Sequence, residues 1–285
     1  MQKCLQCKVV SKNGIINLMK NGKRYLGDPH KAKKKWLKKK EIEDSRSGKV
    51  KDAKIFWDKE YSGEEKNFSL SENPSEDLQK FVRFLEREYK GQQPINRNTK
   101  FVDAGCGNGR NSFYLAENFG AKGIAYDISE EAIKKANNKL KNNSKLDVTF
   151  FVQNLNQKIP AENNSIDLVI DAVASHVLRK EEREFFKQEV LRVLSSGSYY
   201  FLKSLLLDDD SHAKQMIKEF GQNAGEENSY IHPTIGIFEH VPTEEELVKF
   251  YEEDFFIDKI ERSFAHRING RANKRRYIVM YLRKK

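Results

Sequence analysis

The chain has 285 residues, with 52 Lys and Arg, 42 Asp and Glu, and a hydrophobic fraction of 38%. This length allows one large or two small domains with a substantial core, and no apolar run reaches the ~18 residues of a bilayer-spanning helix, so we expect no membrane partner. Three cysteines offer no disulfide framework, and no apolar segment of a secretory signal follows the first residues, so a cytoplasmic location is expected.

Positive charge is concentrated at the N-terminus. Residues 1–51 contain 16 Lys and Arg but 4 Asp and Glu, and the remainder of the chain is slightly acidic. The pattern predicts a basic, flexible arm over 1–51 and a folded domain over 52–285. The lysine-rich run 31–40 fits a solubilising tail or, alternatively, a contact with nucleic acid.

Two cysteines in this arm have the spacing of half a zinc site. Cys4 and Cys7 are separated by two residues, whereas a structural zinc needs four ligands. Because no second cysteine pair follows, we expect no metal, with a degenerate zinc knuckle as the alternative.

The first elements of the domain follow from aromatic and apolar spacing. Residues 56–61 form an aromatic lead-in segment that would either pack into the core or fold over a ligand pocket. Ser75 is then expected to cap a helix, because apolar residues recur at i, i+3, i+4 and i+7 from Leu78.

Strand and helix patterns alternate through the middle of the chain. Apolar runs predict strands at about 100–105, 122–127, 148–154, 166–174 and 198–206, and amphipathic stretches predict helices at about 109–119, 129–141 and 181–194. Continuous apolar strands alternating with helices are typical of a parallel sheet that is covered on both faces.

The last third of the chain departs from this alternation. Residues 207–241 read as an insertion after the fifth strand, and a capping box beginning at Thr243 opens a further helix. Two final strands, at about 255–264 and 275–283, are predicted to form a hairpin whose turn holds Asn269-Gly270.

A glycine-rich loop follows the first of the parallel strands. Asp103-Ala-Gly-Cys-Gly-Asn-Gly109 comes directly after Lys100-Phe-Val and precedes an amphipathic stretch. Glycine lets the backbone turn tightly and lets a ligand approach closely. The next strand ends in Asp127, whose carboxylate can accept hydrogen bonds from both ribose hydroxyls. This layout indicates a strand–loop–helix–strand unit that holds an adenosine.

The position of the third glycine argues against a nicotinamide or flavin dinucleotide. Their fingerprint is G-x-G-x-x-G, and Arg110 stands where its third glycine belongs. The pattern D-x-G-x-G-x-G instead resembles the first motif of the class I S-adenosylmethionine-dependent methyltransferases. Segments 150–155, 165–171 and 191–197 are similar to later strands and turns of that family, and the resemblance extends over about residues 56–285.

The resemblance implies a fold, a cofactor and a site. The fold would be α/β, Rossmann-like and doubly wound, with a mostly parallel seven-stranded sheet and an antiparallel last strand. The cofactor would be S-adenosylmethionine, bound by Asp103, Ala104, Gly105, Cys106, Gly107, Gly109, Arg110, Asp127, Ile128, Asn154, Leu155 and Asp171.

One of these positions departs from the family. Asn154 stands where an acid near the adenine amino group is usual. Its side-chain oxygen can accept the same hydrogen bond, or it can cap a turn.

Methyl transfer from a sulfonium is an in-line displacement, so a base is needed only if the acceptor must lose a proton. His176, after the fourth strand, and His240, at the end of the insertion, are the predicted catalytic residues, with polar packing as the alternative for each. No Asn-Pro-Pro-Tyr or Asp-Pro-Pro-Tyr run follows the fourth strand, and no Pro-Cys nucleophile is present, which disfavours methylation of nucleic-acid bases.

We therefore expect a methyltransferase that acts on a small-molecule acceptor. One alternative is methylation of RNA or a ribosomal protein, with the basic arm as the contact to that substrate. Another is a binding module that has kept the cofactor site without catalysis.

Overall fold

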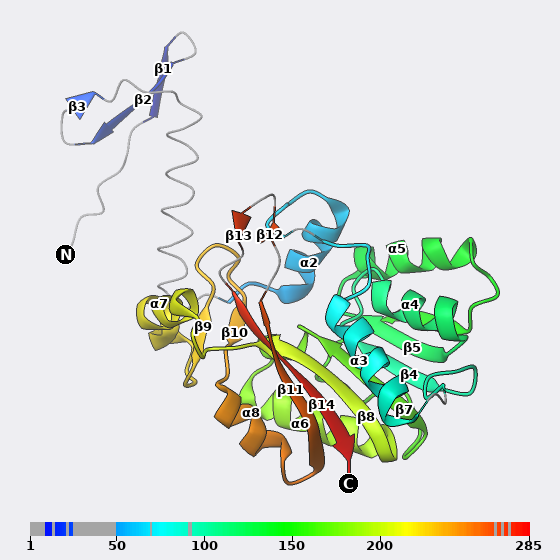
Figure 1. Cartoon of the computed structure of the whole chain (residues 1–285). Coiled ribbons are helices and arrows are strands. Elements are labelled where there is room, and N and C mark those ends of the chain that lie inside the picture. Colours follow the sequence, from blue (N-terminus) through cyan, green and yellow to red (C-terminus); the bar gives the residue numbers. More distant parts are fainter. Residues whose placement is uncertain are drawn as a thin grey trace.

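The computed structural model describes residues 9–12, 15–20, 23–24, 50–68, 70–90, 93–264, 267–268, 271–272 and 275–285. Its centre is a seven-stranded sheet in the order β11-β14-β8-β7-β4-β5-β6 (Figure 1). These strands are β4 (Lys100–Ala104), β5 (Lys122–Asp127), β6 (Val148–Val152), β7 (Ile166–Ala172), β8 (Leu194–Leu205), β11 (Phe255–Phe264) and β14 (Arg276–Lys284).

Strand direction follows the prediction. β4 pairs parallel with β5 and β7, and the parallel pairing continues from β5 to β6 and from β7 to β8. β14 runs antiparallel to both of its neighbours, β8 and β11. The predicted mostly parallel sheet with an antiparallel last strand is confirmed. Strand order reverses between β4 and β7, so the carboxyl ends of these two strands are the expected ligand site.

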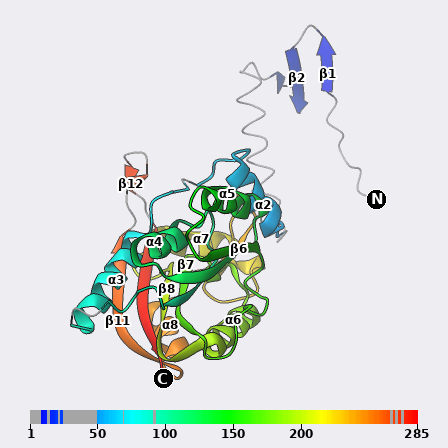
Figure 2. The same cartoon turned by 90° about the vertical axis from the view of Figure 1, so that its right-hand side faces the viewer.

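Helices cover both faces of the sheet (Figure 2). One face carries α3 (Glu76–Glu88), α4 (Arg110–Phe119) and α5 (Glu130–Lys141), and the other carries α6 (Lys180–Val193) and α8 (Glu244–Tyr251). Phe113 belongs to the first buried cluster and Phe186 to the second. Two separate apolar clusters on one sheet are what a doubly wound fold requires.

The expected caps are only partly present. Ser129 accepts the Ala132 N–H (3.1 Å) at α5, and Thr243 accepts the Glu246 N–H (3.1 Å) at α8. Ser75 is the N-cap residue of α3 as predicted, but its side chain makes no capping hydrogen bond. Ser75 is instead buried, with its N–H bound to Asn111 Oδ1 (2.9 Å), and acidic residues in the first turn of α3 interact favourably with the helix dipole.

The junction between α6 and β8 differs from the predicted turn over 191–197. β8 begins at Leu194, directly after α6, so this strand starts earlier than the predicted residue 198. Ile166 pairs with Leu194, but Leu168 pairs with Tyr199, so β8 bulges between these pairs. Gly197 lies in the bulge with φ of 80°, a conformation that glycine adopts readily.

The insertion forms a small unit of its own. It contains α7 (Ser211–Phe220), the 3-10 helix η2 (Gly221–Asn223) and an antiparallel pair, β9 (Ser229–Ile231) and β10 (Phe238–His240). Asp210 caps α7 by accepting the Ala213 N–H (2.8 Å). β10 packs against η1 (Ser175–Val177), the turn that follows β7. The insertion therefore reaches the carboxyl ends of the central strands.

Several sequence predictions fall on other parts of the chain. Within the N-terminal arm, β1 (Val9–Lys12), β2 (Ile15–Lys20) and β3 (Lys23–Arg24) pair antiparallel, whereas Cys4, Cys7 and run 31–40 lie outside the described residues. β12 (Arg267–Ile268) pairs with β13 (Arg271–Ala272) around Asn269-Gly270, which also lies outside them.

Two searches of the described residues gave negative results. No helix in that part of the chain is long and apolar enough to cross a membrane. No group of His, Cys, Asp and Glu residues there is arranged to hold a metal ion.

Candidate active site

Three glycines with left-handed backbone shape the loop between β4 and α4. Gly105, Gly107 and Gly109 have φ of 70°, 56° and 78°, a region that other residues rarely adopt. A Cβ at Gly105 would collide with Ala174, and a Cβ at Gly107 would collide with the Tyr61 hydroxyl. The turn after β7 and a helix before the sheet therefore both approach this loop closely.

Asp127 lies at the carboxyl end of β5 and joins this loop to α5. Its Oδ2 accepts the Gly107 N–H (2.9 Å) and its Oδ1 accepts the Ser129 N–H (2.9 Å). Burial raises the pKa of this carboxyl group, and the two N–H groups oppose that effect. Each oxygen keeps a further lone pair, so the carboxylate can still accept hydrogen bonds from ligand hydroxyls.

Asp103 is a second buried carboxyl group beneath the loop. It is 1% exposed, and Ser112 Oγ donates to its Oδ2 (2.6 Å). Burial is the main cause that raises the pKa of Asp103 to about 6, against the hydrogen bond from Ser112. A cationic group bound nearby would favour the ionised form of this carboxyl group.

The other predicted residues of the loop have structural contacts. Arg110 Nη1 donates to the Asn73 carbonyl (3.2 Å), which ties α4 to the segment before α3. Ala104 is fully buried. Cys106 is also buried, and burial raises the pKa of its thiol well above the ordinary value. A thiol in this state is not a nucleophile.

The turn after β6 holds the predicted adenine contacts. Asn154 Oδ1 accepts the Asn156 N–H (3.3 Å), and the Asn154 N–H donates to Gln157 Oε1 (3.3 Å). This side-chain-stabilised turn ends β6 at Val152, two residues earlier than predicted. Leu155 is buried in the core, and Ile128 is half-buried directly after Asp127. Asn154 therefore caps a turn, and an adenine contact by the same side chain stays a prediction.

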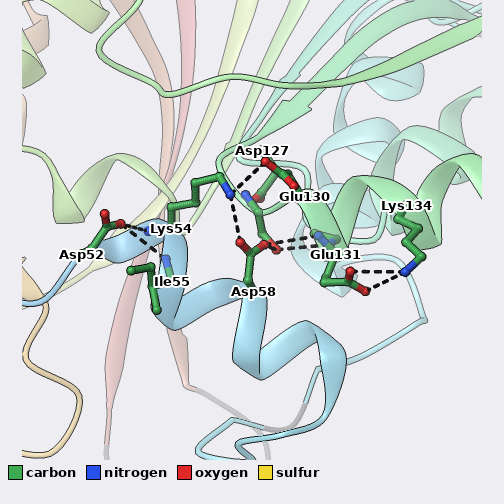
Figure 3. A network of polar contacts seen from close by, with 10 residues as sticks. Asp52, Lys54, Ile55, Asp58, Asp127, Glu130, Glu131 and Lys134 are labelled. Atoms are coloured by element: carbon green, nitrogen blue, oxygen red, sulfur yellow. Dashed lines mark hydrogen bonds and ion pairs between the residues drawn. The ribbon is translucent and has the colours of Figure 1, made fainter.

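Helix α2 (Ala53–Ser62) is clasped to the N-terminal end of α5 (Figure 3). Asp58 Oδ1 accepts from Ser129 Oγ (2.8 Å) and from the Glu131 N–H (3.2 Å). Lys54 Nζ bridges Asp58 Oδ2 (3.1 Å) and Glu130 Oε1 (2.9 Å). Against burial, which raises it, the hydrogen bonds from Ser129 and Lys54 lower the pKa of Asp58. We call these contacts between α2 and α5 the α2 clasp.

Tyr61 lies one helical turn after Asp58, on the same side of α2, with its hydroxyl over Gly107. Burial raises the pKa of this hydroxyl far above its usual value, so it stays protonated. Both Asp58 and Tyr61 lie in the aromatic lead-in segment 56–61, but no individual role was expected for either. Their i, i+3 spacing was the available signal. Phe56 is buried against Ile235 and Ile237 of the insertion, so the segment both packs in a small core and covers the loop.

The turn after β7 is fixed by Asp171. Its Oδ1 accepts the N–H groups of Ala174 (2.9 Å) and Ser175 (3.1 Å), and Tyr200 donates to its Oδ2 (3.0 Å). Val173, inside this turn, has φ of 68°, which is strained for a β-branched residue. Asp171 therefore acts mainly on the backbone that carries His176, rather than being open to a ligand.

The two predicted catalytic histidines have different surroundings. His240 is held at both ring nitrogens, since Nδ1 bonds to Ser229 Oγ (2.9 Å) and Nε2 bonds to Glu246 Oε1 (2.7 Å). His176 lies on η1, and its Nδ1 is buried with no hydrogen-bond partner among the described residues. Burial lowers the pKa of His176 to about 4, so its imidazole is neutral at pH 7. The arrangement favours a structural role for His240 and leaves the His176 imidazole neutral, with Nδ1 unpartnered among the described residues.

The loop fits an adenosyl cofactor with an amino acid tail. The left-handed glycines give the loop its tight turn, Asp127 presents carboxylate oxygens at the end of β5, and Asp103 can balance a cationic amino group. This donor set matches S-adenosylmethionine.

Comparison with known proteins identifies the family of the chain. A family model described as a methyltransferase domain matches residues 95–254, more than half of the chain. The chain is 27% identical over 119 residues to an uncharacterized protein of Haemophilus influenzae. It is 28% identical over 101 residues to a 2-heptyl-1-hydroxyquinolin-4(1H)-one methyltransferase of Mycobacteroides abscessus. These matches cover 41% and 35% of this chain and 47% and 44% of the relatives, so the chain spans less than half the length of either.

Solved structures share the fold. A SAM-dependent methyltransferase from Methanosarcina mazei superposes with a TM-score of 0.57 at 23% identity, over 67% of this chain and 94% of that one. One from Anabaena variabilis gives 0.56 at 16% identity, over 81% and 93%. A geranyl diphosphate C-methyltransferase from Streptomyces coelicolor, solved with S-adenosyl-L-homocysteine, gives 0.52 at 14% identity, over 74% and 79%. The match of the family model shows that the chain belongs to the methyltransferase-domain family.

Proposed function

We propose that this enzyme methylates a small molecule at a proton-bearing oxygen or nitrogen, with His176 as the general base. The observation that carries the proposal is the position of His176. It lies two residues after Ala174, which abuts Gly105 of the cofactor loop, and its ring is neutral without a fixed partner. A neutral imidazole beside the acceptor can remove the proton as the new bond forms.

The remaining residues would position and enclose the reactants. Asp127 would bind the ribose hydroxyls, and Asp103 with the Tyr61 hydroxyl would hold the polar end of the cofactor. The cofactor supplies a methyl group that is already activated on a sulfonium sulfur. Asp171 fixes the turn that carries His176. Helix α2 and the insertion would cover the site and exclude water from it.

Two segments that close over the site, α2 and the insertion, favour a small acceptor. Phe56 of α2 packs against Ile235 and Ile237 of the insertion, so both segments close over the same strand ends. The Mycobacteroides relative is itself named for a small N-hydroxy heterocycle. A reducing cytoplasm fits a chain whose Cys106 is a buried free thiol.

RNA is the second candidate acceptor, because residues 1–51 carry 16 Lys and Arg. The test is incubation with methyl-labelled S-adenosylmethionine and three separate acceptors: 2-heptyl-1-hydroxyquinolin-4(1H)-one, a panel of phenols and amines, and ribosomal RNA. We expect label in a small molecule, abolished in His176→Ala. Label in RNA alone would refute the small-molecule assignment.

A further inference from the structure

A buried carboxylate from the insertion is held in one position by two donors. Glu239, on β10, is 6% exposed, and its Oε2 accepts hydrogen bonds from the Tyr230 hydroxyl and from Arg275 Nη2 (3.0 Å). Arg275 Nη1 also donates to the Tyr230 hydroxyl (2.9 Å). We call these three residues the carboxylate cluster. The hydrogen bonds among the three residues hold the Glu239 carboxylate rigidly in place.

The carboxylate cluster lies beside His176. β10, which carries Glu239, packs directly on η1, which carries His176. The Nδ1 atom of His176 is buried in this region without a hydrogen-bond partner among the described residues, whereas its Nε2 is not among the buried unpartnered atoms. Nδ1 is thus a buried ring nitrogen without a partner in the described part of the chain, on a turn that contacts the strand carrying Glu239.

We propose that Glu239 is a positioning residue for methyl transfer: its carboxylate, fixed by Tyr230 and Arg275, stabilises the imidazolium that forms when His176 takes the acceptor's proton. This inference rests on the proposed function of His176 as the base. The acceptor's proton moves to Nε2, the electron pair of its former bond makes the bond to the methyl carbon, and the pair of the broken carbon–sulfur bond stays with sulfur. His176 then returns the proton to solvent, and Glu239 remains ionised throughout.

Several charges face His176. Burial lowers the pKa of its imidazole, the Glu239 carboxylate on β10 raises it, and Arg275 before β14 and His240 on β10 lower it. Burial raises the pKa of Glu239, but the Arg275 guanidinium and weaker effects of neighbouring groups lower it further, so that the pKa lies below its ordinary value and the carboxylate stays charged. Glu239 is the one negative charge in this set, so replacing it by a neutral isostere should make His176 harder to protonate, and replacing Arg275 should make it easier.

The experiment is an NMR titration of the histidine rings in the S-adenosylhomocysteine complex, with His176 assigned by the signal lost in His176→Gln. In Glu239→Gln we expect the His176 midpoint to fall by about one pH unit. Arg275→Gln should move it upward by a similar amount. Glu226→Gln is the control, because it breaks a different Arg–Glu pair, between Arg183 of α6 and Glu226 of the insertion (Nη2 to Oε2, 3.0 Å), whose charges are not among those that act on His176.

The two opposite shifts keep the inference testable if one variant folds poorly. A His176 midpoint unchanged in folded Glu239→Gln, or unchanged in Arg275→Gln, would overturn the role of Glu239. In the methyl-transfer assay, the acid limb of kcat/KM should follow the same shifts. If the titrations shift as expected but wild-type protein methylates no small acceptor, the proposed function fails while the coupling of Glu239 to His176 stands.

Discussion

At the scale of single residues, Asp103 should make cofactor binding depend on pH. Its pKa is raised from 3.8 to about 6 by burial, and a cationic amino group favours its ionised form. We expect affinity for S-adenosylmethionine to weaken as pH falls below 6, by about tenfold per pH unit. Calorimetry between pH 5 and 8 measures this, with Asp103→Asn as the variant that should flatten the profile. A flat profile in the wild type would contradict the assignment.

The raised pKa of Asp103 also makes folding stability depend on pH, in the opposite sense to cofactor affinity. Between pH 3.8 and about 6, the folded state holds the Asp103 proton more tightly than the unfolded chain does. The contribution of Asp103 to the free energy of unfolding therefore decreases as pH rises through this window. Stability and cofactor affinity should thus change in opposite directions over it.

Asp127 should contribute directly to cofactor affinity. Asp127→Ala removes the expected ribose contact and the acceptor for Gly107 and Ser129 N–H groups, so we expect a loss of roughly 1.5–3 kcal/mol of binding free energy. Asp147→Ala, which removes an exposed carboxylate next to the same sheet, is the calorimetric control. Equal affinities in both variants would exclude Asp127 from the site.

Replacing each of the two histidines by alanine should have a different effect on turnover and on stability. Because it removes the general base, His176→Ala should lower turnover by about 10²–10⁴-fold. Cofactor affinity should stay the same, since His176 does not hold the cofactor. His240→Ala leaves Ser229 and Glu246 without their partner, so it should lower the free energy of unfolding by about 1–3 kcal/mol and leave turnover of the folded fraction near normal. Melting temperature, affinity and turnover measured together decide this. Normal turnover in His176→Ala would end its catalytic assignment.

At the scale of elements, the α2 clasp should control how fast the cofactor leaves. Asp58→Ala removes the acceptor for Ser129 and the Glu131 N–H, which should accelerate release of labelled S-adenosylmethionine about tenfold. Lys59→Ala, an exposed residue of the same helix, is the control and should release it at the wild-type rate. An unchanged rate in Asp58→Ala would show that α2 does not cover the bound cofactor.

Local sequence patterns were sufficient to predict some helices and strands but not all of their ends. The amphipathic spacing from Leu78 predicted α3, since apolar periodicity depends only on which face is buried. The burial of Ser75, whose N–H donates to Asn111 of a later helix, was not predictable from the local pattern. The start of β8 was missed for a similar reason: pairing with Ile166 extends the strand back to Leu194, across a bulge.

At the scale of the whole molecule, the basic arm should be dispensable for cofactor binding. The boundary for deletion is residue 49, because the Lys51 N–H donates to the Gly236 carbonyl (2.9 Å) and Asp52 caps α2 through the Lys54 N–H (2.8 Å). Deleting residues 1–49 should leave affinity for S-adenosylmethionine unchanged by calorimetry. If it abolishes both catalysis and a steeply salt-dependent binding of RNA, RNA replaces the small molecule as the acceptor.

The sequence by itself determined the fold class, the cofactor and its loop. Apolar runs that alternate with helices, the glycine spacing from Gly105 and the acid at Asp127 are local features, and the chemistry of adenosine binding requires them in this order. Only the tertiary structure gave His176 and His240 different surroundings, brought Asp58 to α5 and Tyr61 to the glycine loop, and placed Glu239 on a strand beside η1. These relations join residues that are far apart in the chain, and burial and partner geometry, which give each side chain its chemical state, exist only after the chain has folded.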